Sequence, residues 1–468
     1  MLNLTLTRAM IGRALPAALA CMAPTIAIGA PGHAKAPGKV ASKAASKPAV
    51  RSAVKAAPKV AAPQTMMLTT PDVEPYIDLG LQAVVQGKPD VGVTFLNQGL
   101  KIARGLKDLT GEGRCLFVLG VAYKLKKQDA RALDYFQQSI AVSHAAHNVV
   151  TETVGCELAG MLAVNLNASG AARSLYAHTG SLLQHATDSN DNASSLIKLG
   201  DFGIRLHEYG SALAHLRSAR EMADRLGNVP LYVSASIAIA MGDVGLYRPG
   251  LADRIATQIG YGTETDALDL LAETRPIFLA GTDLKRSAQS LHDVSMAISY
   301  LAANLSSHNQ AQRYVGVTAT FLADSARLAR RCGDRGLELD ATADLSGDQV
   351  AQGSYAIAFA LVDRSMALLT ATSTPDQRGD VLQAKGVALS LSGQPQAAIQ
   401  PLEEAVEYYN IAGEKVDAAF ANLALSDVYS QLGNGQAAKA RSDVATQLMA
   451  SGQQTEDEIE VGKNIAGK

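Results

Sequence analysis

Apolar residues along most of this chain recur every three or four positions, which places them on one face of an α-helix. Within residues 116–139, Leu116, Leu119 and Tyr123 lie at positions i, i+3 and i+7 and share one face of a first helix. A second stripe follows at i, i+4 and i+7, formed by Ala132, Phe136 and Ser139. The pattern predicts two helices that pack against each other through these stripes.

Small residues mark the points where the two helix backbones approach closely, because a larger side chain would push the axes beyond the usual separation of about 8–10 Å. In this segment they are Gly120, Ala132 and Ser139. The same pattern returns in steps of 40 residues, in one block on each side of residues 246–300. The residues at the position of Gly120 in the other copies are also small, namely Gly80, Gly160, Gly200, Gly386 and Ser426. Two further copies, at Ser346 and within 305–325, fit the pattern more loosely.

The repeated unit resembles the tetratricopeptide repeat (TPR), in which Leu-Gly, Tyr, Ala, Phe and a small residue occur at these offsets. The step of 40 exceeds the ~34 residues of a common TPR and is similar to the longer-period repeats of kinesin light chain. The resemblance implies an all-α fold, a TPR-like α-solenoid of about eight to ten helical hairpins. Such an array grows in one direction and needs no single globular core.

The chain divides into six predicted parts. Residues 1–30 carry Arg8 and Arg13 and then an uncharged apolar run, which is typical of a secretory signal peptide. A lipoprotein with Cys21 at its mature end and an uncleaved anchor are the alternatives. A linker follows at 31–70. After it, we expect a first repeat block at 71–245, an irregular helical insert or divergent repeat at 246–300, a second block at 301–450 and a polar tail at 451–468.

The linker, residues 31–70, is rich in Ala, Lys and Pro, and this composition predicts disorder. Residues 1–65 hold nine bases and no acid, so the remainder carries 33 bases against 44 acids. The linker is therefore either a solvated spacer or a contact for an anionic surface such as lipid headgroups, a cell-surface polymer or nucleic acid. The bases that would make this contact are Lys35, Lys39, Lys43, Lys47, Arg51, Lys55 and Lys59.

The search for chemistry yields no enzyme motif: the sequence has no Walker A loop, no HExxH and no paired CxxC. We therefore expect no enzymatic activity, no cofactor and no metal. His144 and His147 lie three residues apart, but they lack a third ligand at fixed spacing and are interpreted as solvated helix-end residues. Cys115 and Cys156 lie on first helices of adjacent copies, where buried free thiols are expected and a disulfide is the alternative.

A partner-binding surface remains as the functional expectation. The TPR resemblance implies that first helices line a concave groove, through positions three before, one after and four after the marker glycine. A peptide or amphipathic helix would lie there; the alternative is that these residues pack against the neighbouring copy. In the first four copies they are Ile77, Leu81, Val84, Phe117, Val121, Lys124, Glu157, Met161, Val164, Ile197, Asp201 and Ile204. The overall expectation is an exported scaffold, periplasmic or extracellular, for protein–protein interaction, with anchoring through the basic linker as the alternative and an enzyme with a site in 246–300 as the less favoured one.

Overall fold

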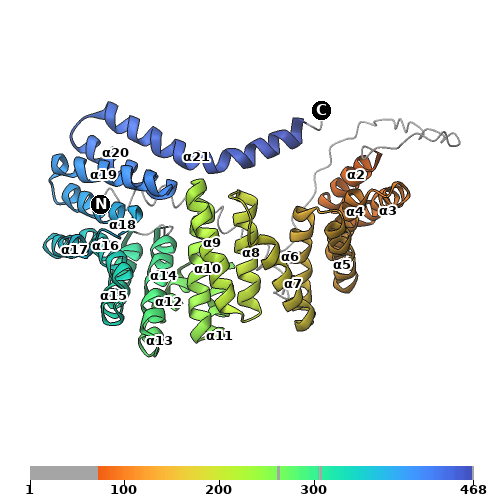
Figure 1. Ribbon diagram of the computed structural model, residues 1–468, viewed down its shortest axis with the longest axis horizontal. Helices are drawn as coiled ribbons and strands as arrows, with labels where there is room; N and C mark the ends of the chain where they lie inside the picture. The colour runs from red at the N-terminus through yellow and green to blue at the C-terminus, as the bar shows by residue number, and fades with distance from the viewer. Residues whose placement is uncertain (1–71, 261–263, 304, 306–307, 466–468) are drawn as a thin grey trace, which may run out of the picture.

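The computed structural model describes residues 72–260, 264–303, 305 and 308–465, with 451–465 described by their helix alone. All regular secondary structure in these ranges is helical. The N-terminal block consists of four antiparallel helix pairs (Figure 1). They are α2 (Glu74–Val85) with α3 (Pro89–Leu106), α4 (Leu109–Leu125) with α5 (Asp129–Ala145), α6 (Val149–Asn165) with α7 (Ser169–Leu183), and α8 (Asn190–Arg205) with α9 (Tyr209–Leu226).

The remaining helices continue the stack and include two short ones. The pairs are α10 (Val229–Tyr247) with α11 (Pro249–Gly260), α14 (Leu284–Ala303) with α15 (His308–Cys332), α16 (Arg335–Ala351) with α17 (Tyr355–Leu368), α18 (Pro375–Leu391) with α19 (Pro395–Ala412), and α20 (Lys415–Gln431) with α21 (Gly435–Ile465). The short helices are α12 (Glu264–Ala272) and α13 (Arg275–Leu279). Nine antiparallel pairs are therefore present among the described residues, and the predicted all-α solenoid of eight to ten hairpins is confirmed.

A turn with one left-handed residue recurs at intervals of 20 residues, except near 187 and 373, and explains the step of 40. Left-handed φ angles occur at Gly87, Lys107, Lys127, His147, Asn167, His207 and Gly227 in the first block and at Gly333, Gly353, Gly393, Gly413 and Gly433 in the second. At these turns the next amide bonds back to a carbonyl of the last helical turn, as in Asp108 N to Ala103 O at 2.9 Å. This is the hydrogen bond of a Schellman motif, which ends a helix and lets the chain reverse.

The two blocks differ in register because of the segment between them. Gly227 and Gly333 are 106 residues apart, which is five steps of 20 and six residues more. Helix α10 packs directly on α14, while α12 and α13 contact α11 and α14 at the side of the stack. First helices therefore continue from α10 to α14 without a break, and the short helices lie outside their stacking.

The solenoid curves until its C-terminal part meets its middle. Helix α20 contacts α9, and α21 contacts both α8 and α9 (Figure 1). The backbone amide of Val416, in the first turn of α20, donates a hydrogen bond to Asp224 Oδ1 of α9 at 2.9 Å. Helices α9 to α20 thus form a closed turn of the superhelix.

The core is distributed along the array, as expected of stacked repeats. One large cluster runs from α6 to α16, and smaller clusters fill the spaces between other neighbouring helices. Helix α10 is long and apolar enough to cross a membrane, but 83% of that stretch is buried inside the array, which is the environment of a core helix. Cys115 and Cys156 are buried free thiols, and burial raises the pKa of each to about 12.

Candidate functional site

A polar cavity of about 680 Å³ lies inside the closed turn. Its wall is built mainly from first helices of consecutive pairs, namely α10, α14, α16, α18 and α20, with α9 and the end of α19 completing it. Four lining residues lie 40 positions apart and form one column: Tyr300, Asp340, Asp380 and Phe420. The repeat period thus places one residue of each copy on the same line of the wall.

Carboxylates dominate the lining of this cavity. They come from α9, α16, α18 and the start of α20: Glu221, Asp224, Asp340, Asp344, Asp376, Asp380, Glu414 and Asp417. The basic side chains of the lining are Arg220, Arg225 and His292. Each of these bases has an acidic partner already. The cavity therefore presents an excess of acidic side chains over basic ones.

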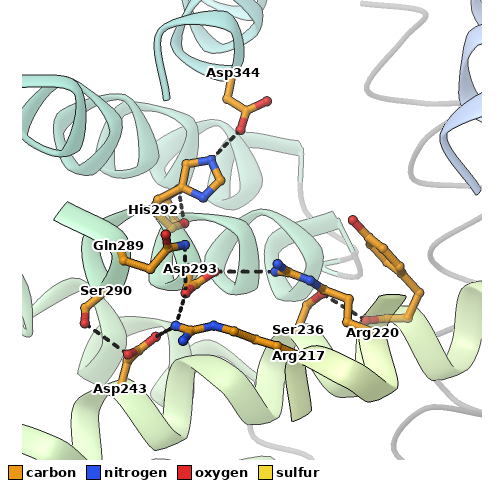
Figure 2. Close-up of polar contacts among 11 residues, drawn as sticks. Arg217, Arg220, Ser236, Asp243, Gln289, Ser290, His292, Asp293 and Asp344 are labelled. Atoms are coloured by element: carbon orange, nitrogen blue, oxygen red, sulfur yellow. Dashed lines mark hydrogen bonds and ion pairs between the residues drawn. The ribbon is translucent and has the colours of Figure 1, made fainter. Parts of the chain in front are cut away.

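The two arginines of the lining are bound to carboxylates that do not line the cavity. Arg225 binds the exposed Asp188 through two hydrogen bonds of 2.7 and 2.9 Å. Arg220 reaches the buried Asp293 at 3.4 Å, and Arg217 reaches the same carboxylate at 3.1 Å, as Figure 2 shows. Both arginines of the wall are therefore paired with carboxylates outside the cavity, and not with the acidic residues that line it.

The buried network around Asp293 fixes α9, α10 and α14 relative to one another (Figure 2). Gln289 donates to Asp293 at 3.1 Å, and Ser290 donates to Asp243 at 3.0 Å. Burial, and then the charge of Asp293, raise the pKa of Asp243 well above its ordinary value. Proton binding is therefore favoured on Asp243 over Asp293, whose pKa is lowered because burial is outweighed by the charges of Arg220, His292 and Arg217.

His292 joins this network to the acidic wall. Its Nε2 lies 2.9 Å from Asp344 Oδ2, and the two residues belong to α14 and α16 (Figure 2). Burial opposes protonation of His292, but the bond and charge of Asp344 outweigh it, and the pKa of His292 is raised. The protonated form of His292 is therefore favoured, and it faces a carboxylate of the acidic wall.

Burial raises the pKa of several cavity carboxyls toward neutrality. The pKa is about 7 for Asp340 and Glu414 and about 6 for Asp224, with burial as the largest cause in each case. Asp380 and Asp417 have their pKa raised well above the ordinary value by burial and then by neighbouring acids. A cation in the cavity would favour the ionised forms, so this wall is suited to binding positive charge.

A second, more apolar cavity of about 350 Å³ adjoins the first. The two cavities share Tyr300, Asp344, Asp380, Gln383, Val387 and Tyr409 as lining residues. The Tyr409 hydroxyl donates to Asp380 at 2.8 Å, and the Oε1 atom of Gln383 is buried with no hydrogen-bond partner among the described residues. The rest of the wall includes Ala302, Ala303, Val315, Ala351, Ala384 and Leu391. An apolar group beside a cation would find its complement here.

Two side-chain clusters have the composition of a cation site. The carboxylates of Asp224, Glu414 and Asp417 have oxygens within 4.8 Å of one another in the cavity wall. Ligand atoms of His144, Glu152 and His178 meet the same distance limit elsewhere, on α5, α6 and α7. The second cluster does not include His147, the neighbour that the sequence suggested for His144.

The residues expected to line an N-terminal groove lie mostly within or between the repeats. Five are buried: Ile77, Val84, Glu157, Ile197 and Ile204. Six are half-buried, namely Phe117, Val121, Lys124, Met161, Val164 and Asp201, and Leu81 is exposed. Phe117, Val121, Met161 and Val164 pack against core clusters, which corresponds to the packing alternative. Burial raises the pKa of Glu157 to about 7 and that of Asp201 to about 6.

The same offsets identify cavity residues when they are applied to the second block. Three before and one after Gly386 are Gln383 and Val387, which line both cavities. The corresponding residues around Ser346 are Ala343 and Gly347, which line the smaller cavity. The offsets from the marker residue thus identify cavity residues in the second block, whereas the predicted groove residues were all in the first four copies. The basic residues Lys35 to Lys59 lie outside the described residues.

The contacts of the marker glycines decide the type of repeat. A Cβ atom on Gly80, Gly120, Gly200 or Gly386 would lie 2.3–2.6 Å from a side-chain atom of the residue 16 positions later, which is Leu96, Phe136, Leu216 or Leu402. These are the small and large positions of the repeat signature, in contact inside each helix pair. The chain has a TPR-like repeat fold.

Solved structures resemble the chain over most of its length. The apo form of RapI has 10% identity and a TM-score of 0.37, covering 82% of this chain and 98% of its own. Aspartyl phosphate phosphatase F from Bacillus subtilis has 12% identity and a TM-score of 0.35, covering 83% and 97%. The apo form of the quorum sensor NprR from B. thuringiensis has 12% identity and a TM-score of 0.33, covering 81% and 99%.

No protein-family model and no curated protein matches the sequence. A structural likeness at these identities and TM-scores carries no argument for a shared ligand or activity. The TPR-like fold therefore rests on the helix pairing, the 20-residue turns and the glycine contacts of this chain, and its function must be argued from the cavity.

Proposed function

We propose that this protein is an interaction scaffold that holds a basic segment of a partner protein in the cavity enclosed by α9 to α20. The observation that carries the proposal is the acidic lining of a 680 Å³ cavity whose arginines are already paired. Lysine and arginine side chains would relieve the repulsion among Asp340, Asp380 and Asp417. The neighbouring tyrosine rings, Tyr300 and Tyr409, suit cations as well as apolar groups.

The shape of the site favours an extended segment over a folded domain. The cavities lie inside a superhelical turn closed by the contact between α9 and α20, so an entering ligand must be narrow. The apolar second cavity adds a place for one apolar side chain beside the basic residues. The proposed ligand is therefore an extended peptide with lysine or arginine next to an apolar residue.

The test is a binding titration with two matched peptides. One is a short labelled peptide that contains lysines and a leucine; the other carries glutamate in place of each lysine. We expect the basic peptide alone to bind, with an affinity that falls as salt rises. Equal binding of both peptides, or of neither, would contradict the proposal.

A pair of variants locates the site. Asp340→Asn with Asp417→Asn removes two carboxylates of the wall. We expect it to weaken binding of the basic peptide by at least about tenfold, or ~1.4 kcal/mol. Asp363→Asn with Asp443→Asn removes the same number of acidic residues at exposed positions outside the cavity lining, and should leave binding unchanged. A similar loss in both variants would mean that net charge, and not the cavity, attracts the peptide.

Export and surface anchoring are proposals from the sequence. The apolar segment within 1–30 supports a signal peptide, and the bases of 31–65 support contact with an anionic surface. N-terminal sequencing of the mature chain in the cell envelope tests the first. Release of the chain from anionic vesicles on deletion of 31–65 tests the second, and undiminished retention would refute it.

A further inference from the structure

The second cluster of possible metal ligands lies in the N-terminal block, away from the acidic cavity. Glu152 stands in the first turn of α6, and its side chain is 2% exposed. Its Oε1 atom lies 2.9 Å from His144 Nδ1 of α5 and 2.7 Å from His178 Nε2 of α7. Three consecutive helices thus bring three ligand atoms to one point.

We infer that His144, Glu152 and His178 form a binding site for a zinc ion. Two imidazoles and one carboxylate are a common set for Zn²⁺, with bond lengths of about 2.0–2.2 Å and a fourth position left for water or another ligand. The three ligand atoms lie within 4.8 Å of one another. A tetrahedral ion with such bonds needs ligand atoms separated by about 3.3 Å. The two histidine nitrogens, at 2.9 and 2.7 Å from Glu152 Oε1, lie slightly closer to the carboxylate than that.

The exposure of the two histidine side chains suits this adjustment. Glu152 is fixed by burial, whereas the side chains of His144 and His178 are 70% and 37% exposed. Their rings meet edge-on with centroids 6.0 Å apart, so neither ring lies between the other and the carboxylate that both contact. The exposed side of the cluster gives the ion a path of entry from solvent.

The electrostatics of the cluster also favour an ion. A buried carboxylate costs several kcal/mol unless a positive charge or hydrogen bonds compensate it. The two neighbours of Glu152 Oε1 are imidazole nitrogens, at 2.9 and 2.7 Å. Zn²⁺ would bring positive charge to the buried oxygen, and both imidazoles could bind the same ion. Cys156, one turn further along α6, keeps its proton because burial and the charge of Glu152 raise its pKa to about 12.

The measurement is a titration of the full chain, first freed of metal with a chelator, with Zn²⁺ alone. We expect one equivalent to bind and to raise the unfolding temperature, because binding to the folded state stabilises it. Co²⁺ in place of Zn²⁺ should give the visible absorption bands of a tetrahedral site.

Three variants assign the ligands. His144→Gln and His178→Gln should each weaken Zn²⁺ binding by more than about tenfold, since even loss of a residue that only orients a ligand costs that much. His147→Asn is the matched control, because it removes an exposed histidine three residues from His144 that is absent from the cluster, at a left-handed position that Asn tolerates. It should bind Zn²⁺ like the wild type.

The variant His144→Gln decides whether the zinc site exists. His144 is largely in solvent, so His144→Gln folds whether or not a metal is present. If wild type and His144→Gln bind Zn²⁺ equally, or if the wild type binds no Zn²⁺ and gives no tetrahedral Co²⁺ spectrum, the site does not exist and the histidines serve only as hydrogen-bond donors to Glu152.

Discussion

The carboxylate of Asp224 accepts a hydrogen bond of 2.9 Å from the backbone amide of Val416, a residue 192 positions later in the chain. Amides in the first turn of a helix have no partner within that helix, and a carboxylate there also complements the helix dipole. Asp224 therefore caps α20 from a distant repeat. Burial, opposed by this bond, sets its pKa to about 6.

Replacement of Asp224 by alanine should open the closed turn. We expect a loss of about 1 kcal/mol, as for other capping residues, and faster hydrogen exchange in α20. Exchange measured by mass spectrometry on peptides from 415–431 checks this. Asp188→Ala is the control, because it breaks an exposed pair with Arg225 on the neighbouring surface and should leave exchange in α20 unchanged.

Asp293 should be the most sensitive charged residue of the array. Asp293→Asn leaves Arg217 and Arg220 without their buried anion, and removal of one partner from such a network costs about 3–5 kcal/mol. Urea unfolding followed by circular dichroism measures the loss. A cost below about 1 kcal/mol would mean that solvent or Asp243 replaces the missing charge.

The marker glycines should resist even the smallest side chain. In Gly200→Ala the new Cβ would lie 2.3 Å from Leu216 Cγ, and relief of that overlap should cost about 1–3 kcal/mol. Gly210→Ala, in the next helix, meets no atom within 4 Å and should be neutral or stabilising by up to about 1 kcal/mol. The difference in unfolding temperature between the two variants is the measurement.

Stability should fall as the pH rises from about 4 to 8. Asp340, Asp348 and Glu414 have pKa values of about 7, raised mainly by burial, so the folded state holds protons that the unfolded state releases near pH 4. The unfolded chain is therefore increasingly favoured as these groups ionise. Thermal unfolding at pH 6 and pH 8 should give the lower transition temperature at pH 8.

The same titration gives a control and a link to the ligand. Asp340→Asn with Asp417→Asn should flatten the dependence on pH, since both residues have a raised pKa in the folded state. A basic peptide in the cavity should raise the transition temperature more at pH 8 than at pH 6. An unchanged pH profile in the double variant would place the responsible groups elsewhere.

The architecture could be predicted from the sequence because the contacts that define each repeat join residues close together in the chain. Gly120 and Phe136 contact each other within a single hairpin, so their spacing along the chain reports their packing directly. The 20-residue turns add the same information through Gly87, Gly227 and Gly393. The fold of each repeat can therefore be predicted from the residues of that repeat alone.

The site was harder to predict because it depends on the curvature of the whole array. Asp224 and Asp417 come together only when the superhelix completes a turn, and no local spacing encodes that turn. The column from Tyr300 to Phe420 was present in the sequence at steps of 40, but equal spacing alone does not say which column faces inward. The His144, Glu152 and His178 cluster likewise joins three helices whose spacing follows no metal motif.

The contact between α9 and α20 limits how this chain can change in length. An open solenoid tolerates the gain or loss of a whole hairpin, because each unit meets only its neighbours. Here a hairpin added between α14 and α18 would carry α20 past α9 and remove the acceptor for Val416, whereas one added before α2 would disturb neither. Evolution by duplication is thus open at the N-terminal end of the array and closed around the cavity.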